Sequence, residues 1–290
     1  MTTDLIYEKK LRLRSEHVNS ARRLRTSSLL RLLQEASIAH TTELGMGRDK
    51  TLDRGLLWII SHQSLEIRRM PVYDEDIIVR SWPGPMLHMF FPRYYEVCSP
   101  DGEVLITGSA LWLLMSEETR KAVFPAAWSV EIPGAACAPR TDLPAPLRAP
   151  AGAEFTLSGV FTPRFSQTDI NGHMNNTFYY DLAEDLLPGE FLLQSFPSVI
   201  RAEYLEEIRP GTVCDVRGLR TDAGSSSDDG SSSGAGSAQS AEEQTWYFEG
   251  VRREEAAKAS SAAAKPKVLF RIEMTFSPAG THGSRLPEDA

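Results

Sequence analysis

The sequence predicts an α+β protein made of two tandem copies of one unit, each a helix packed on an antiparallel sheet. The first observation is the order strand, long helix and four strands, which occurs within residues 1–120 and again within residues 158–280. The second is a short repeat, in which residues 64–71 parallel residues 204–210. The third is a proline-rich segment, residues 121–157, whose composition predicts an extended linker between the copies.

The first copy opens with residues 7–14, where apolar and charged side chains alternate as in a half-buried strand. A long helix follows, with Ser27 or Ser28 as its N-cap and Gly45 and Gly47 at its end. Its apolar stripe at helical spacing consists of Leu29, Leu32, Leu33, Ala36 and Ala39. Turn residues then separate four predicted strands, at 57–69, 77–82, 90–97 and 103–115.

The second copy repeats this order. A strand is predicted at residues 161–165, and the helix after His173 is marked by Phe178, Tyr179, Leu182, Ala183 and Leu186. Four more strands are predicted at 198–208, 213–220, 244–251 and 268–276. Two insertions interrupt them: the Gly/Ser/Asp-rich residues 221–243, expected to be disordered, and residues 254–267, expected to form a transient helix at most. Because both lie between strands, the sheet should stay intact.

Composition and charge exclude several classes of protein. A net charge of −8 argues against general nucleic-acid binding, and no apolar run approaches the roughly 20 residues that span a membrane. The N-terminus lacks the apolar core of a secretory signal. The three cysteines, Cys98, Cys137 and Cys214, are widely spaced and odd in number, which indicates neither a disulfide framework nor a metal site. The sequence therefore predicts a cytoplasmic protein with reduced thiols, no metal and no cofactor.

One segment departs from the overall acidic balance. Residues 9–31 contain eight lysines and arginines against a single acid, Glu16. Two interpretations fit this basic segment: a solvated face, or a docking surface for an acidic partner.

The polar residues Asp169, Asn171 and His173 stand at positions i, i+2 and i+4, with turn-forming residues between them. In a loop this spacing can direct all three side chains into one pocket. Asn175 or Asn176 is a natural N-cap for the helix that follows, and the unpaired N–H groups of its first turn could polarise a carbonyl.

Glu207 is the second candidate feature. The repeat places it in a strand, where the first copy has the apolar Ile67, and the first copy has residues 15–20 in place of the Asp-x-Asn-x-His loop. A buried acid is costly unless it is paired. Two interpretations stay open: a solvated acid at a strand end beside a capped loop, or one polar site made by Asp169, Asn171, His173 and Glu207 in an apolar groove.

These residues resemble the acyl–acyl carrier protein thioesterases, which have a double hot-dog fold. In the first copy the resemblance rests on residues 55–61, 66–73 and 79–83. In the second it rests on the Asp-x-Asn-x-His-x-Asn-Asn segment of residues 169–176, with Tyr179 or Tyr180, and on residues 203–207. The resemblance implies two hot-dog units, each a long helix wrapped by a sheet, and catalytic positions at Asp169, Asn171, His173 and Glu207.

The sequence departs from the family at two places. Many members carry a cysteine just after the glutamate, where this chain has Ile208, so a Cys–His mechanism is not expected. Gly172 stands where other members often have a larger residue, which could loosen the loop.

The implied reaction is hydrolysis of the thioester of acyl-acyl carrier protein, which releases a free fatty acid and ends chain elongation. Glu207 with His173 would activate water as general base, Asp169 would hold His173 or share the base role, and Asn171 would orient the water or a carboxylate. Direct attack by a carboxylate stays open. The acyl chain would lie against the first copy, where Trp58, Met46 and Met89 are candidate lining residues, and the basic segment would steer the acidic carrier protein.

Two alternatives remain. A hot-dog hydratase or dehydratase acting on enoyl thioesters uses a related loop, but the i+4 histidine and the separate Glu207 favour hydrolysis. A non-catalytic acyl-thioester binding module would tolerate loss of either residue. The sequence does not determine the preferred chain length, the choice between carrier-protein and coenzyme A thioesters, or whether two chains pair as a homodimer.

Overall fold

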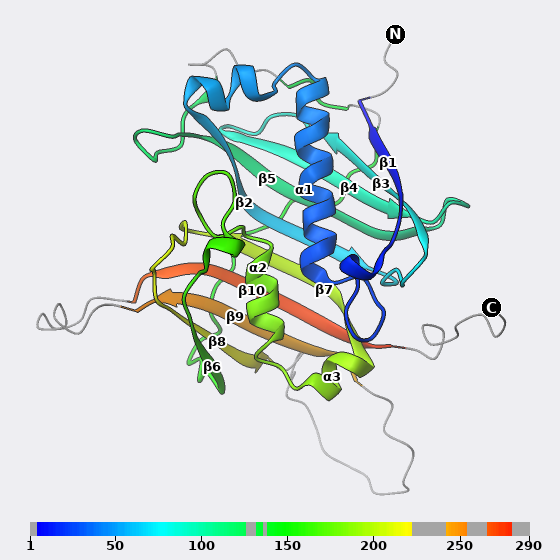
Figure 1. The fold of residues 1–290 in the computed structure, drawn as a ribbon, viewed down its shortest axis with the longest axis vertical. Helices are drawn as coiled ribbons and strands as arrows, with labels where there is room; N and C mark the ends of the chain where they lie inside the picture. The colour runs from blue at the N-terminus through cyan, green and yellow to red at the C-terminus, as the bar shows by residue number, and fades with distance from the viewer. Residues whose placement is uncertain (1–4, 126–131, 136–137, 222–241, 254–265, 280–290) are drawn as a thin grey trace, which may run out of the picture.

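The computed structural model describes residues 5–125, 132–135, 138–221, 242–253 and 266–279. Within these residues ten strands form one antiparallel sheet, in the order β1-β3-β4-β5-β2-β7-β10-β9-β8-β6 (Figure 1). The strands are β1 (Tyr7–Arg12), β2 (Leu56–Ile67), β3 (Asp76–Pro83), β4 (Phe90–Cys98), β5 (Val104–Ser116), β6 (Leu157–Phe161), β7 (Ser195–Tyr204), β8 (Cys214–Thr221), β9 (Gln244–Arg252) and β10 (Val268–Pro278).

Three α-helices lie in the described residues: α1 (Thr26–Glu43), α2 (Phe178–Glu184) and α3 (Gly189–Gln194). Helix α1 crosses the half of the sheet that holds β1 to β5, and α2 crosses the half that holds β6 to β10, on the same face (Figure 1). Each half has the same strand order counted outward from the centre. The predicted repeat of one α+β unit is therefore confirmed, and the two units are joined edge to edge.

Strands β2 and β7 form the joint between the units. They pair from His62 opposite Glu203 to Glu66 opposite Val199. Glu203 is buried here, 2.8 Å from Arg271 and 3.5 Å from His62. Because Arg271 pairs with this acid, the joint does not leave the buried charge unpaired.

The N-cap of helix α1 lies two residues before Ser27, the first of the two predicted positions. This N-cap is Arg25, which makes no capping bond through its side chain. The hydroxyls of the first two residues of α1 contact acids of the other unit instead: Thr26 donates to Glu184 over 2.5 Å, and Ser27 bonds Asp181. The first turn of α1 is thereby bound to the second unit.

At its other end α1 stops where the sequence indicates. Leu44 is the C-cap, and Gly45 follows with φ of +79°, the left-handed conformation that ends many helices. Between these ends, Leu29, Leu33 and Ala36 are buried in the core shared with the sheet.

The second unit departs from the expectation of a long helix. Helix α2 has seven residues and α3 has six, so only the first unit has a long one. The predicted strand at 161–165 is also displaced: β6 ends at Phe161, and Phe165–Gln167 form a 3₁₀ turn. Pro163 lies between them and has no N–H to donate to a strand partner.

The proline-rich linker packs along the sheet in its described residues, 121–125, 132–135 and 138–156, and forms no sheet strand there. Its carbonyls accept hydrogen bonds from both units: Trp82 donates to Pro139, Ser109 to Asp142 and Arg271 to Leu147. The linker is thus held to the units that it connects.

The two insertions leave the sheet intact, as predicted, because β8 pairs with β9 and β9 pairs with β10. The predicted disorder and the predicted transient helix concern residues that lie almost entirely outside the described ones. No helix within the described ranges is long and apolar enough to cross a membrane.

Candidate active site

The loop that carries Asp169, Asn171 and His173 is shaped by its own acid. Asp169 Oδ1 accepts the N–H of Asn171 over 2.8 Å and lies 3.5 Å from the N–H of His173, while the Asp169 N–H donates to the His173 carbonyl over 2.8 Å. Gly172 closes the turn with φ of +75°, a conformation that glycine adopts without steric cost. The carboxylate thus holds His173 through the backbone.

His173 is 6% exposed, and its Nε2 lies 2.9 Å from Oε2 of Glu207. Nε2 is therefore the ring nitrogen that faces the acid. Burial lowers the pKa of His173, the Glu207 charge opposes this, and Arg120, Asp169 and Arg209 contribute smaller effects. With its pKa below the ordinary value near 6.5, the imidazole is neutral at neutral pH.

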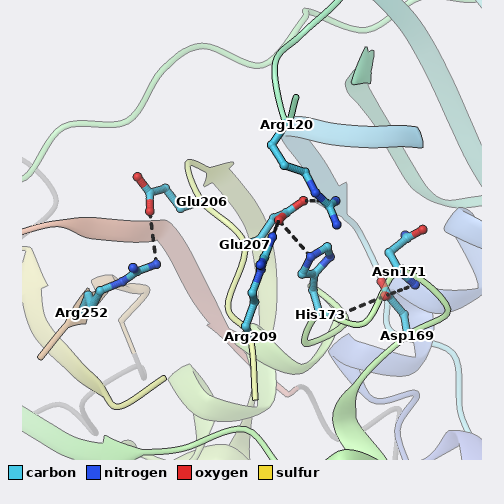
Figure 2. A network of polar contacts seen from close by, with 8 residues as sticks. All are labelled: Arg120, Asp169, Asn171, His173, Glu206, Glu207, Arg209 and Arg252. Carbon is cyan, nitrogen blue, oxygen red and sulfur yellow. Dashed lines mark hydrogen bonds and ion pairs between the residues drawn. The ribbon is translucent and has the colours of Figure 1, made fainter. Parts of the chain in front are cut away.

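Glu207 lies outside the strand that the repeat predicted for it. Strand β7 ends at Tyr204, where the N–H groups of Leu205 and Glu206 both donate to the Leu269 carbonyl, so the chain leaves the sheet before Glu207. Glu207 then meets three cationic or hydrogen-bonding groups: His173, Arg120 at 3.0 Å and Arg209 at 3.5 Å (Figure 2). The acid is therefore paired, and the interpretation as a solvated strand-end acid is wrong.

Its neighbour Glu206 turns away from the imidazole. Glu206 contacts Lys267 at 2.6 Å. It also contacts Arg252 at 3.4 Å, on the other side of the segment (Figure 2). Of the two adjacent acids only Glu207 faces His173.

The segment that carries Glu207 is hydrogen-bonded, through Ile208, to the loop of residues 169–174. The Met174 N–H donates to the Ile208 carbonyl over 2.8 Å, and the Ile208 backbone also bonds the Tyr179 hydroxyl. Tyr179 is buried and stacks on Phe270 with ring centroids 4.5 Å apart. These contacts set the spacing of His173 and Glu207.

The first unit contains the same loop without its chemistry. Asn19 repeats the hydrogen bonds of Asp169: its Oδ1 accepts the Ala21 N–H, and its N–H donates to the Arg23 carbonyl. Arg23 therefore stands where the second unit has His173. The counterpart of the motif is residues 19–23 and not 15–20 as expected.

The same comparison corrects which residue of the first unit corresponds to Glu207. Strand β2 ends at Ile67 as β7 ends at Tyr204, and the Pro71 carbonyl accepts the Leu24 N–H as the Ile208 carbonyl accepts that of Met174. Glu207 thus corresponds to Met70 and not to Ile67. At this place the second unit pairs an imidazole with an acid, whereas the first unit has Arg23 and Met70.

The expected N-cap at Asn175 or Asn176 is wrong, because Thr177 is the N-cap of α2. Asn175 stabilises the turn before it: its Oδ1 accepts the N–H and the hydroxyl of Thr177, and its own N–H donates to Gln167. Asn176 lines the cavity beside His173, and its N–H has no hydrogen-bond partner in the part of the chain that the structure describes. The N–H group that is free to donate a hydrogen bond to a substrate carbonyl is therefore that of Asn176.

A cavity of about 360 Å³ joins these groups to the first unit. Its polar end holds the predicted residues Asp169, Asn171, His173 and Glu207 together. Its other walls come from both units. The first unit contributes Gln34 of α1, Trp58, Ile59, Ile60 and Ser61 of β2, and Trp112, Leu113 and Met115 of β5, and the second contributes Met174, Asn176, Tyr179, Tyr204, Leu205 and Glu206. Trp58 lines it as expected, whereas Met46 and Met89 do not.

Two arginines at this site were not predicted. Arg120 follows β5 in the first unit, and Arg209 follows Glu207 by two residues. Arg209 could have been noticed by its position near the acid. Nothing in the sequence near Arg120 relates it to a residue 87 positions away.

The basic segment is partly engaged in structural contacts. Arg12 pairs with Asp76 at 2.6 Å, and Arg14 with Asp74 at 3.6 Å. The guanidinium of Arg23 donates to the carbonyls of Leu192, Leu193 and Ser195. Its role in steering a partner stays a prediction.

The described cysteines are poor nucleophiles. Cys98 and Cys214 are buried and free, and burial raises the pKa of both thiols, that of Cys214 to about 11. Cys137 lies outside the described residues. Within the described residues, no three His, Cys, Asp or Glu side chains are grouped to hold a metal.

Comparison with known proteins gives two family matches. The N-terminal domain of acyl-ACP thioesterases matches residues 4–124, and their C-terminal domain matches residues 153–246. A dodecanoyl-[acyl-carrier-protein] hydrolase of Cinnamomum camphora is 25% identical over 238 residues, which cover 77% of this chain and 61% of the relative. An acyl-[acyl-carrier-protein] hydrolase of Cuphea viscosissima is 23% identical, over 70% of this chain and 52% of its own. The chain thus spans about half to three-fifths of these relatives.

Solved structures show the same fold. A putative oleoyl thioesterase from Lactobacillus plantarum has a TM-score of 0.71 at 20% identity, covering 95% of this chain and 96% of its own. An acyl-ACP thioesterase from Bacteroides thetaiotaomicron has a TM-score of 0.71 at 18% identity, covering 96% and 100%. The arrangement of two hot-dog units is thus shared along nearly the whole length of each.

Proposed function

Since the chain belongs to the acyl-ACP thioesterase family, we propose that it hydrolyses the thioester of acyl-acyl carrier protein and releases the free fatty acid. The observation that carries the proposal is the 2.9 Å contact between His173 and Glu207 at the polar end of a cavity whose other walls are largely apolar. The curated relatives are named as acyl-carrier-protein hydrolases, which supports the same substrate class.

In the proposed mechanism a water molecule attacks the thioester carbonyl. The Glu207–His173 pair takes the proton of the water as general base, while the Asn171 carboxamide orients that water. The Asn176 N–H donates to the carbonyl oxygen as negative charge develops there. A C–O bond forms, the C–S bond breaks, and the proton passes to the sulfur of the departing thiol.

The geometry favours water over direct carboxylate attack. Both oxygens of Glu207 are already engaged, one with Arg120 and the other with His173 and Arg209. Asp169 Oδ1 is directed to its own loop backbone. Single-turnover hydrolysis in ¹⁸O-water separates the routes. Attack by a carboxylate on the thioester would release the thiol and form an anhydride, and water that opens this anhydride at the side-chain carbonyl leaves ¹⁸O in the protein, whereas direct water attack places ¹⁸O in the fatty acid only.

The test is release of thiol and free acid from a panel of acyl-acyl carrier protein thioesters, with coenzyme A thioesters beside them. His173→Ala and Glu207→Gln should remain folded and lose about 10²–10⁴-fold in rate. Glu206→Gln is the matched control, because that adjacent acid lines the same cavity but pairs with Lys267 and Arg252 in place of the imidazole, and it should keep most of the wild-type rate. Wild-type protein that releases no acid, or variants that release it unchanged, would refute the proposal; hydration of an enoyl thioester in its place would favour the hydratase.

Three further expectations belong to this proposal: a preference for the carrier-protein thioester, a cytoplasmic location, and pairing of two chains as a homodimer. The joint between β2 and β7 supports a complete site in one chain, since both walls of the cavity come from the same chain. Sedimentation equilibrium across a range of concentrations tests the pairing.

A further inference from the structure

The cavity of the proposed active site is followed by a second, smaller one. Trp58 and Trp112 line this main cavity of about 360 Å³ and also an inner cavity of about 30 Å³. On helix α1, Gln34 lines the main cavity, whereas Ile38 and Thr41, about one and two turns later, line the inner one. The two cavities therefore follow one another along the helix, with the two tryptophans between them.

The wall between the cavities is built from adjacent strands. Phe91 of β4 lies opposite Trp112 of β5, and Trp112 lies opposite Ile60 of β2. Trp58 is two residues before Ile60, so its side chain points to the same face of the sheet. The Trp58 indole packs edge-on against the Phe91 ring, with centroids 4.9 Å apart. Phe91 thus supports the wall from the side of the inner cavity, which it lines.

The two tryptophans of this wall are held in different ways. The Trp112 indole N–H donates to the Tyr95 hydroxyl over 3.2 Å. The Trp58 indole N–H has no hydrogen bond to any described residue. Packing therefore holds Trp58 in place, and a smaller apolar side chain at this position would break no hydrogen bond of the indole to the described residues. Trp58 is the part of the wall that a substitution can remove with the least damage to the fold.

The space behind Trp58 suits an apolar chain. Its lining includes apolar side chains from α1, β4 and the linker, namely Ile38, Phe91, Pro92 and Ile132. The hydroxyls that line it are engaged within the protein, because Ser37 donates to the Leu33 carbonyl and Thr41 accepts from Arg93. With Trp58 in place, about 30 Å³ is room for only about two water-sized groups.

We propose that Trp58 sets the length of the acyl chain that the protein hydrolyses, by closing the main cavity against the inner one. This inference rests on the proposed hydrolase function, in which the thioester lies at the polar end of the cavity beside His173 and the chain extends toward Trp58. A longer chain has to displace the indole from its packing on Phe91, whereas a smaller side chain opens the inner cavity to it. Because one methylene in an apolar pocket changes kcat/KM by about tenfold or more, such a wall discriminates between chains two carbons apart.

The test measures kcat/KM for a series of saturated acyl-acyl carrier protein thioesters whose chains increase by two carbons. For Trp58→Leu, chains longer than the wild-type optimum should gain about tenfold or more relative to that optimum. Trp58→Phe, which keeps a ring beside Phe91, should give a smaller shift in the same direction. Circular dichroism confirms that each variant is folded.

Trp246→Leu is the matched control. Trp246 is also partly buried, its indole N–H also lacks a hydrogen bond to any described residue, and its ring also packs against a phenylalanine, Phe248. It lines neither of the two cavities. This variant should therefore keep the wild-type preference for chain length.

The proposal is overturned if the preference of Trp58→Leu is unchanged or moves to shorter chains, if Trp246→Leu shifts it equally, or if both folded Trp58 variants hydrolyse no chain. Each of these results leaves the hydrolase assignment in place, because the wild type still releases acid. Wild-type protein that hydrolyses no thioester in the series would refute the proposed function itself, so the two failures are distinguishable.

Discussion

Arg120 of the first unit forms an ion pair with Glu207 of the second, with Nη1 of the arginine 3.0 Å from Oε1 of the acid. Arg120 has a φ of +53°, unusual for a residue other than glycine, and its N–H donates to the Ser116 carbonyl in the turn after β5. The site is therefore completed by a residue from the other half of the chain.

Replacing Arg120 by Gln should lower kcat/KM by about tenfold, because the loss of a partly exposed ion pair frees the Glu207 carboxylate. Arg120 lowers the pKa of His173, so its removal raises that pKa. Hydrolysis needs the neutral imidazole, and the acid limb of the pH profile should therefore move to higher pH. A pH profile of kcat/KM measures both effects.

Arg120→Lys is the control for this prediction, since it keeps the charge and loses the shape of the guanidinium. It should leave the acid limb close to its wild-type position while reducing the rate. An acid limb that stays in place in Arg120→Gln would show that Arg120 does not act on the His173–Glu207 pair.

Local signals made most of the fold predictable. The apolar stripe around Leu29 and Leu33 located α1, and alternation together with turn residues located nine of the ten described strands. The same signals found the loop of Asp169, Asn171 and His173, because three polar groups at this spacing are a property of a short segment.

The features that the sequence does not predict depend on contacts between residues that are far apart in the chain. The cap of α1 was missed because its partners, Glu184 and Asp181, come from the other unit. The predicted alignment of the two copies is three residues out of register. It matches the Leu-Glu pairs at 65–66 and 205–206, whereas the true register follows from where β2 and β7 end, and only the strand pairing shows those ends. Arg120 was missed for the same reason.

Cys214→Ala should keep kcat/KM within about twofold of wild type, because a buried thiol with a pKa of about 11 supplies no thiolate at neutral pH. The variant should lose about 1 kcal/mol of unfolding free energy, since removing the sulfur from a buried position leaves a small cavity. Hydrolysis assays and urea unfolding measure the two quantities. A large loss of rate in a folded variant would reopen the cysteine mechanism.

Gly172→Ala should destabilise the protein by about 1–2 kcal/mol, because a side chain at φ of +75° is strained even though nothing lies within 4 Å of its added Cβ. It should also slow hydrolysis severalfold, since the turn positions His173. Gly102→Ala is the matched control. This glycine has φ of +92° and the same open surroundings, and it is far in sequence from the loop that carries His173. It should cost similar stability, measured by urea unfolding, and leave the rate unchanged. Equal rates in both variants would contradict a positioning role for the turn.

Glu184→Gln should flatten the pH dependence of stability. Burial raises the pKa of Glu184 from 4.5 to about 7, so the folded protein binds this proton more tightly than the unfolded chain does. The stability that it contributes is complete below pH 4.5 and is lost as pH rises to about 7.

The Gln variant keeps an acceptor for Thr26 and should be more stable than wild type above pH 7 by about 1–2 kcal/mol. Urea unfolding across this pH range measures the difference, with the exposed Glu190→Gln as control. An unchanged slope in Glu184→Gln would show that the acid is ionised in the folded protein.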